Sequence, residues 1–583
     1  MGGTWGTAVF TPEGSFSCDT MLLLTDGSVL VHDASSVNWL RLTPDAQGKY
    51  ETGRWSGLLP MANTRDAFAS GVMQDGRVYV VGGEHSDAGH DTPLGEIFDP
   101  AQNTWGPLVK PADFDYIQGD APSCVLANGN ALFGNLQAWS PPFKTALWDP
   151  LSDSWKYAGS GFGTLTQDTK AADCDEETWN LLPDGSVLTV NTNNPPHAER
   201  YIPSIDEWVS AGTTPNSLVL YLITDPTGLE VSVDEIGPAI LLPDGRLFAI
   251  GGTGQTALYT PPPAGSDPKM TPGTWLPGPS FPPDTSAGSV WPTLTASDAP
   301  AVLQTNGKVL LAAGNLFEIS EGIPGSADYF SRNMTFLEYD PVAETIVPFP
   351  ALPFSPADGP QTQYAHLLLV PTGQIFLTTQ INVIYIYTPD AASNTPADSW
   401  RPVITSCPTN LVNGDSYTLT GTQLNGLSQA VSYGDDAQMA TNYPLVRLSN
   451  ETGTVRYMPT SNFSTMGVAT GTDPVTADFL VTKVDPGPWQ LTVIANGIAS
   501  EPWDVEVNVS GAELCLELYD GILQRLRDHG PPVTPGERAE VAQQLAQCHR
   551  EGNLTLAQYE TALHALNEIN EPSEPPPVHP PPL

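Results

Sequence analysis

Short apolar runs recur along the first 400 residues, and a glycine-containing turn separates the first two runs of each unit. A unit has an apolar run, the turn, a second run such as Val78 to Val81, a third run often ending in Asp-Pro or Thr-Pro, and a fourth with an aromatic residue. Asp-Gly and Asn-Gly favour positive φ, so we expect two-residue hairpin turns. The seven turns are Asp26-Gly27, Asp75-Gly76, Asn128-Gly129, Asp184-Gly185, Asp244-Gly245, Asn306-Gly307 and Thr372-Gly373.

The fourth run of most units carries a tryptophan, and the sixth unit, which ends near Phe349, lacks one. Four strands in a repeat of about 50 residues are typical of a kelch-type propeller blade. The pattern therefore predicts an all-β fold with a seven-bladed β-propeller over residues 1–400. The tryptophans expected on fourth strands are Trp55, Trp105, Trp155, Trp208, Trp275 and Trp400.

The pattern changes after residue 400. Residues 401–509 alternate apolar and polar positions, as in Ser416 to Thr420, which predicts an immunoglobulin-like β-sandwich. Residues 512–570 switch to helical spacing, with Thr534-Pro535 opening one helix and a capping box from Thr555 to Gln558 opening another. Residues 571–583 are rich in proline and predict an extended tail.

Charge narrows the possible partners. The 583 residues carry 22 Lys and Arg against 65 Asp and Glu, a formal net charge of -43. Such a surface repels nucleic acids and anionic membranes, and no run of about 18 apolar residues predicts a membrane span. The start of the chain lacks a signal-peptide pattern, and the spacing of the six cysteines leaves a disulfide possible without identifying a pair.

Two segments carry a family resemblance. The propeller followed by Arg401 to Thr405, and the stretch Ser432 to Gln438, resembles galactose and glyoxal oxidases, whose sandwich domain sends a loop to the propeller axis. With Asn442 to Arg447 and Ser464 to Thr470, the chain is most similar to uncharacterised bacterial kelch proteins with this early-set domain. The resemblance covers residues 1–509.

The oxidases hold copper with two tyrosines and two histidines, and one tyrosine is linked to a cysteine. The resemblance places Cys18 at the cysteine, but Ala67 at the linked tyrosine and Gln438 at the last histidine. Gln363 and Tyr364 stand at the positions of the Tyr-His pair. Tyr364 and His366 are the residue types that the pair needs, but in the wrong register. His85 stands at the position of the stacking tryptophan. A one-residue shift would restore that pair but not the ligands at 67 and 438, so copper-radical oxidation is disfavoured.

The same offset from each turn predicts one residue per blade around one mouth of the central channel. Converging carboxylates there would attract a hard cation such as Ca²⁺, with Asp120, Glu176 and Asp298 as candidate ligands. Alternatively, these acids cap loops as Asx-turns do. A loop with Glu84, His85, Asp87 and His90 is a weaker transition-metal candidate. The seven positions are Cys18, Ala67, Asp120, Glu176, Ile236, Asp298 and Tyr364, with nearby acids at Asp19, Asp66, Asp173, Asp175, Glu177, Asp234 and Glu235.

Two classes of function follow. The first is a non-catalytic binding or scaffold protein, secreted or in the cell envelope, whose propeller face takes a glycan, protein or cation and whose helical tail mediates assembly, such as a homo-oligomer. It requires no cofactor beyond a possible Ca²⁺. The second is an enzyme that reuses the axial pocket without copper. Its candidate groups are Cys18, His85, Asp120, Glu176, Asp298 and Tyr364.

Overall fold

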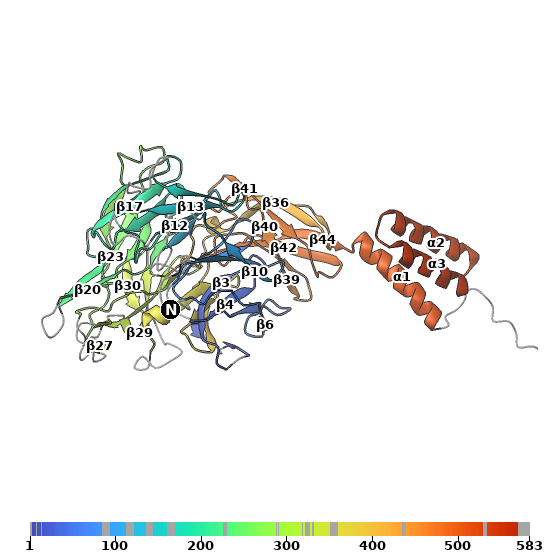
Figure 1. Cartoon of the computed structure of the whole chain (residues 1–583), viewed down its shortest axis with the longest axis horizontal. Coiled ribbons are helices and arrows are strands. Elements are labelled where there is room, and N and C mark those ends of the chain that lie inside the picture. Colours follow the sequence, from blue (N-terminus) through green and yellow to red (C-terminus); the bar gives the residue numbers. More distant parts are fainter. Residues whose placement is uncertain are drawn as a thin grey trace, which may run out of the picture. The chain divides into compact units, whose positions relative to one another are not determined.

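The computed structural model confirms the all-β propeller (Figure 1). Seven sheets each contain four consecutively paired antiparallel strands, counted over the described residues. The structure describes the chain except for residues 1–2, 7–8, 13, 84–91, 93, 112–121, 136–143, 160–169, 172, 225–229, 287–288, 290, 317–318, 321–326, 329–330, 350–358, 434–438, 529–532 and 570–583.

The blades run from the innermost to the outermost strand in sequence order, with one exception in the last blade. The first three are β3 (Cys18–Leu23), β4 (Val29–Asp33), β5 (Trp39–Thr43) and β6 (Arg54–Gly57); β7 (Ala69–Val72), β8 (Val78–Val81), β9 (Gly95–Asp99) and β10 (Thr104–Leu108); and β11 (Ser123–Val125), β12 (Ala131–Gly134), β13 (Thr145–Asp149) and β14 (Ser154–Ala158). The next three are β15 (Asn180–Leu181), β16 (Val187–Val190), β17 (His197–Ile202) and β18 (Glu207–Thr213); β21 (Ala239–Leu241), β22 (Leu247–Ile250), β23 (Thr256–Thr260) and β24 (Thr274–Pro277); and β25 (Ala301–Leu303), β26 (Val309–Leu316), β29 (Ser331–Asp340) and β30 (Thr345–Pro348). Two hairpins are inserted, β19 (Leu220–Thr224) with β20 (Glu230–Glu235) and β27 (Ile319–Ser320) with β28 (Ala327–Asp328).

The seventh blade closes the ring with the N-terminal segment. It holds β31 (His366–Leu369), β32 (Ile375–Thr378) and β33 (Val383–Pro389), and its outer strand is β1 (Gly3–Trp5), while β2 (Val9–Phe10) also pairs with β33. The prediction that Trp400 lies on this fourth strand is wrong, because Trp400 ends a short 3₁₀ helix, η3 (Asp398–Trp400). Trp5 takes the place instead and stacks on Phe336 at 5.5 Å between ring centroids.

The seven turns lie where predicted, between the first and second strands of each blade, but their geometry differs from the prediction. In the first blade, Gly27 N–H donates to Leu24 O and Leu24 N–H donates to Ser28 O. This pattern is a three-residue loop in which Gly27, at φ +74°, has the left-handed conformation and Asp26 does not. Asp26 instead accepts the Ser28 N–H at 3.1 Å, so the aspartate caps the turn.

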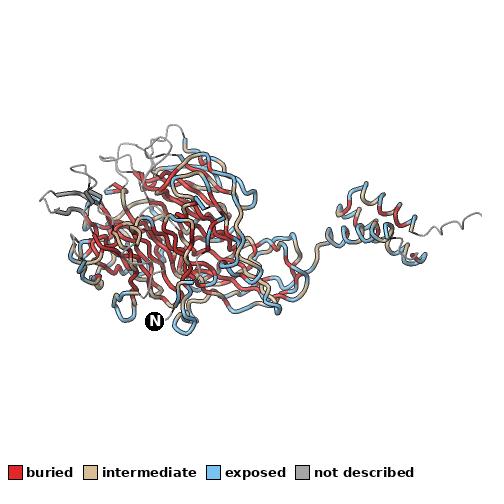
Figure 2. Tube along the Cα trace, turned by 90° about the horizontal axis from the view of Figure 1, so that it is seen from below, coloured by how far each residue is buried: buried red, intermediate tan, exposed pale blue. Residues whose placement is uncertain are grey.

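The core lies along the inner strands of the blades, where buried residues concentrate (Figure 2). All four residues of β8 are buried, and so are all four of β12, β16 and β22. Strands with both faces covered read as continuous apolar runs, which explains the second run of each unit. Tryptophans of the outer strands pack on neighbouring rings, as Trp105 does on Trp39 at 5.6 Å between centroids.

The chain divides into two compact units. The first comprises Met1–Pro408, Ser416–Leu480 and Gln490–Asp504, and the second comprises Thr409–Asp415, Val481–Trp489 and Val505–Leu583. After the propeller, one sheet has the order β34 (Val403–Ser406), β36 (Ser416–Thr422), β41 (Pro474–Leu480) and β40 (Thr460–Ser461). Another pairs β42 (Gly487–Ala495) with β38 (Leu445–Ser449), β38 with β39 (Val455–Met458) and β42 with β43 (Ile498–Ala499), while β35 (Asn410–Val412) pairs in parallel with β44 (Trp503–Asn508).

The second unit ends in three helices, α1 (Gly511–Arg527), α2 (Pro535–Arg550) and α3 (Leu556–Glu568). A capping box from Thr555 to Gln558 opens α3, and α2 begins after Thr534, as the sequence predicts. The structure adds a second capping box, from Thr534 to Glu537, at the start of α2. A disulfide joins Cys515 to Cys548 and so links α1 to α2. No helix within the described residues is long and apolar enough to cross a membrane.

Candidate functional site

The innermost strands form a ring around the propeller axis. Strand contacts run from β7 through β11, β15, β21, β25 and β31 to β3. A short segment of the sandwich region, β37 (Val431–Ser432), pairs with β25 through Ala301 with Ser432 and Val302 with Val431. The sandwich region therefore supplies backbone to the centre of the propeller, as the resemblance implies.

Three carboxylates from three successive blades converge near the starts of the innermost strands. One oxygen each of Glu176, Glu235 and Asp298 lies within 4.8 Å of the others. We call these three residues the carboxylate group. Glu176 has φ +55° and Asp298 has φ +41°, a left-handed conformation that aims each side chain differently from a regular strand residue.

The structure thus brings together two of the three predicted metal ligands. It adds Glu235 instead of Ile236, which falls at the offset but is buried in the apolar core. The inserted hairpin of β19 and β20 precedes this blade, so the acid reaches the group from the end of β20, one residue before the offset position. Asp120 lies outside the described residues.

A buried ion pair supports the loop that carries Glu176. Lys170 donates to Glu177 Oε1 at 2.5 Å and lies 3.0 Å from Glu199 Oε2, and the Lys170 and Glu177 side chains are fully buried. Asn191 donates to both glutamates at 2.9 Å. Of the adjacent acids Glu176 and Glu177, one therefore joins the carboxylate group and the other is held in the core.

Asp173, in the same loop, is also buried and accepts the Cys174 N–H at 2.7 Å. Burial raises the pKa of Asp173 to about 6, since the opposing hydrogen bond from Cys174 does not compensate for lost hydration. This loop therefore contains buried acids, and Lys170 is a buried positive charge beside them.

At the positions of the copper-radical site, Cys18 is fully buried on β3. Burial, followed by the charges of Asp33 and Asp19, raises its thiol pKa to about 12. A thiol with this pKa stays protonated and is a poor nucleophile at neutral pH. Ala67 stands where the oxidases have the linked tyrosine, and its side chain is only a methyl group. Its backbone has the left-handed conformation, at φ +44°.

The predicted site residues of the seventh blade, Tyr364 and His366, differ in burial. Gln363 and Tyr364 belong to a 3₁₀ helix, η2 (Thr362–Tyr364), where Tyr364 is 38% exposed. Tyr433 of the sandwich loop donates its hydroxyl to Gln363 O at 2.8 Å and stacks on His366 at 4.9 Å between centroids. His366, in contrast, is buried at the start of β31.

Several predicted residues cannot be placed. Gln438, His85 and the loop acids and histidine Glu84, Asp87 and His90 lie outside the described residues. The sequence pattern does not indicate His32, a buried histidine on β4, because the offset from each turn leads to the first strand of a blade and His32 lies on a second strand.

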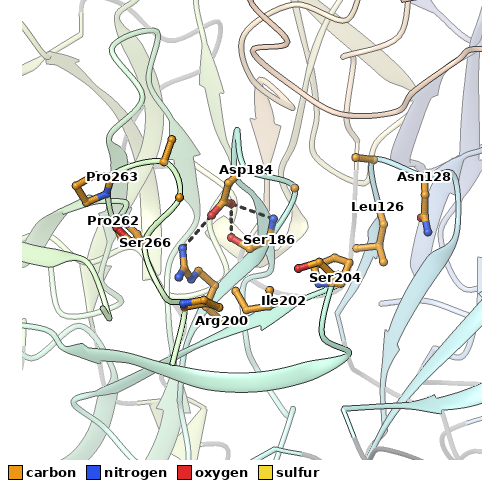
Figure 3. Close-up of a pocket in the computed structure, with 16 residues that line it drawn as sticks. Leu126, Asn128, Asp184, Ser186, Arg200, Ile202, Ser204, Pro262, Pro263 and Ser266 are labelled. Carbon is orange, nitrogen blue, oxygen red and sulfur yellow. Dashed lines mark hydrogen bonds and ion pairs between the residues drawn. The ribbon is translucent and has the colours of Figure 1, made fainter. Parts of the chain in front are cut away.

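A pocket of about 360 Å³ lies on the side of the blade turns (Figure 3). Its buried Arg200 donates to Asp184 at 3.0 Å, and Asp184 also accepts the Ser186 N–H at 3.0 Å. The charged pair therefore holds the Asp184-Gly185 turn. These contacts assign the pair a structural role.

Comparison with known proteins finds similar solved structures at low sequence identity. The solved structure of a fungal alcohol oxidase of the AA5 family, in complex with copper, is 15% identical with a TM-score of 0.47 and covers 87% of this chain and 99% of that chain. A streptogramin B lyase is 11% identical (TM-score 0.38; 66% and 97% covered), and the WD40 propeller domain of Doa1 is 9% identical (TM-score 0.38; 67% and 99% covered). No protein-family model and no curated protein matches the sequence. Similarity this low carries no argument about activity.

Proposed function

We propose that the protein is a non-catalytic binding protein whose propeller mouth holds Ca²⁺ through the carboxylate group. The observation that carries the proposal is the convergence of Glu176, Glu235 and Asp298 oxygens within 4.8 Å. Ca²⁺ binds oxygens at 2.3–2.6 Å, so two oxygens on one ion lie at most about 5 Å apart. Three carboxylates at this spacing suit a hard cation that takes further oxygens from water or from a ligand.

Calorimetry with Ca²⁺ tests the site directly. The full chain is expected to bind Ca²⁺, and the double variant E176Q/D298N, which keeps the shape but removes two charges, is expected to bind at least 10-fold more weakly. Asp398→Asn is the control, because its carboxylate is 98% exposed. Absence of Ca²⁺ binding in the full chain, or equal affinity in the double variant, would contradict the proposal.

Binding is favoured over copper-radical oxidation by the residues at the resembling positions. Ala67 has no phenol to be oxidised, and the Cys18 thiol is buried and protonated. We therefore propose that copper is not the resident metal. Metal analysis of the purified protein tests this, and stoichiometric copper would overturn it.

We further propose that the ligand on the propeller face is a glycan or a protein and that the protein is secreted or in the cell envelope. The Cys515–Cys548 disulfide supports this location, because disulfides persist in oxidising compartments. A glycan array probed with and without Ca²⁺ tests the ligand class, and a Ca²⁺-dependent glycan signal is the expected result for a glycan ligand. Labelling of intact cells tests the location.

The helical segment 512–570 is proposed to mediate assembly. Leu514, Leu516 and Leu556 are 51%, 41% and 55% exposed on α1 and α3, and a partner that covers these side chains would remove apolar surface from water. Deleting the residues after 511 is expected to lower the number of chains per particle in solution. An unchanged oligomeric state would contradict this proposal.

A further inference from the structure

A second group of metal-ligating side chains lies in the propeller, on blades other than those of the carboxylate group. One ligand atom each of Asp19, His32 and Asp66 lies within 4.8 Å of the others, and all three residues are buried. Asp19 lies on β3, His32 on β4, and Asp66 shortly before β7. His366 of β31 lies beside this group of three, with its Nδ1 3.6 Å from Oδ1 of Asp19. The first, second and seventh blades therefore each supply a ligand.

The hydrogen bond on the far side of His32 determines which ring nitrogen faces Asp19 as an acceptor. Nε2 of His32 lies 3.1 Å from the carbonyl oxygen of Ser36, which can only accept, so Nε2 carries the proton. Nδ1 of His32 lies 3.4 Å from Oδ2 of Asp19. A cation between this nitrogen and this oxygen would bind both atoms.

His366 provides an independent observation. It is 5% exposed, and its Nδ1 has no hydrogen-bond partner while pointing at Asp19. A buried ring nitrogen without a hydrogen bond costs free energy that a bound ligand would recover. The ring is held in place by stacking on Tyr433, so the nitrogen is positioned by packing.

The donor types suit a metal centre, and the spacing suits one at Asp19, His32 and Asp66, with His366 beside them. Ligand atoms 2.0–2.2 Å from a tetrahedral Zn²⁺ are about 3.4 Å apart, which is the separation of His32 Nδ1 from Oδ2 of Asp19. Nδ1 of His366 lies 3.6 Å from the other carboxylate oxygen, Oδ1. The carboxylates and the His32 ring are also oriented from behind, as metal ligands commonly are. Gln380 donates to Asp19 at 3.2 Å, and Ser35 donates its N–H and hydroxyl to Asp66.

We propose that Asp19, His32, Asp66 and His366 bind a divalent transition-metal cation, for which Zn²⁺ is the probe. Two imidazoles favour Zn²⁺ over Ca²⁺, which prefers oxygen ligands alone. Trp39 and Phe68 lie 4.9 and 5.1 Å from the His32 ring, so apolar rings wall one side of the site. The site is independent of the carboxylate group and does not rest on the proposed function.

The test uses the full chain stripped with chelator and titrated with Zn²⁺ in excess Ca²⁺, which keeps the carboxylate group occupied. We expect one Zn²⁺ per chain, binding at least 10-fold weaker in His32→Gln and His366→Gln, and visible absorption bands of tetrahedral Co²⁺ in the wild type only. His197→Gln, on an exposed histidine, and H85Q/H90Q, in the loop predicted as a weaker site, are expected to bind as the wild type does.

A wild-type chain that binds no Zn²⁺ overturns the proposal whatever the variants do. Loss of binding only in H85Q/H90Q overturns it as well. Thermal melts check that the His32 and His366 variants fold; if either does not, a Zn²⁺-dependent rise in the wild-type Tm that H85Q/H90Q retains decides the matter. E176Q/D298N is expected to keep Zn²⁺ binding, which separates this outcome from that of the Ca²⁺ site.

Discussion

Replacing Lys170 by methionine removes the buried cation beneath the loop that carries Glu176. Lys170→Met keeps an unbranched side chain, shorter by the charged end atom, but leaves Glu177 and Glu199 buried beside each other without a counter-charge. Breaking a buried ion pair from one side costs about 3–5 kcal/mol, and two stranded carboxylates place this variant at the upper end.

The expected change in melting temperature follows from the size of the propeller. At about 2.1 cal/mol/K per residue over roughly 400 residues, the unfolding entropy is about 0.8 kcal/mol/K, so the loss corresponds to a Tm lower by about 4–6 °C. Thermal unfolding followed by circular dichroism measures it. The control is Lys156→Met, because Lys156 pairs with Asp206 at 2.7 Å but is 44% exposed, and an exposed pair contributes less than about 1 kcal/mol.

The pH dependence identifies the cause. Without Lys170, the folded-state pKa values of Glu177 and Glu199 rise above their unfolded values, so both acids stabilise the fold only while protonated. The Tm deficit is therefore expected to be largest at pH 8 and to shrink toward pH 5. The triple variant K170M/E177Q/E199Q should recover part of the loss at pH 8. A K170M deficit no larger than that of K156M, or one independent of pH, would refute the reasoning.

Three further predictions concern the loop acid, the disulfide and the turns. Asp173→Asn keeps the acceptor for Cys174 N–H but cannot ionise; because the folded pKa of about 6 exceeds the unfolded value, Asp173 destabilises the fold as pH rises through 6, so the variant should melt a few degrees higher at pH 8, with no gain below about pH 4. The variant C515S/C548S opens a loop with a sequence separation of 33 and should destabilise the helices by about 3–4 kcal/mol, seen as a lower denaturant midpoint by far-UV circular dichroism; an unchanged midpoint would contradict this. Gly245→Ala should cost roughly 1 kcal/mol in urea unfolding for its positive φ alone, and Gly27→Ala at least twice that, because its Cβ would lie 2.6 Å from the Tyr457 ring; equal costs would show that the contact relaxes.

The repeat could be predicted from sequence because its signals are local. A turn glycine such as Gly27 and the apolar run after it lie within one hairpin, so their spacing alone identifies the strand pair. The closing strand could not be predicted this way. Trp5 and Tyr387 lie at opposite ends of the propeller sequence, and they pair only because the last blade closes the ring.

The residues of the candidate site likewise divide into those that local spacing predicts and those that depend on tertiary structure. Glu176 and Asp298 were predicted because they share one offset from their own turns, whereas Glu235 lies one residue off that offset, at the end of an inserted hairpin. The Cys515–Cys548 bridge depends on how α1 packs on α2, which spacing does not reveal. His32 was missed because no rule linked a second-strand residue to the axis.

The two proposed cation sites place different ligand atoms on different blades of one repeat. Where Glu176 and Asp298 adopt the left-handed conformation, their blades direct oxygen ligands alone into the carboxylate group. On the first and seventh blades, Cys18 and Tyr364 fall at that offset without joining either group, and nearby Asp19 and His366 supply the ligands instead. A shift of one or two residues within the same blade scaffold thus changes the donors from oxygen alone to mixed nitrogen and oxygen. Because cation preference follows donor type, the two groups are expected to differ in the cation they select, even though both derive from the same repeat.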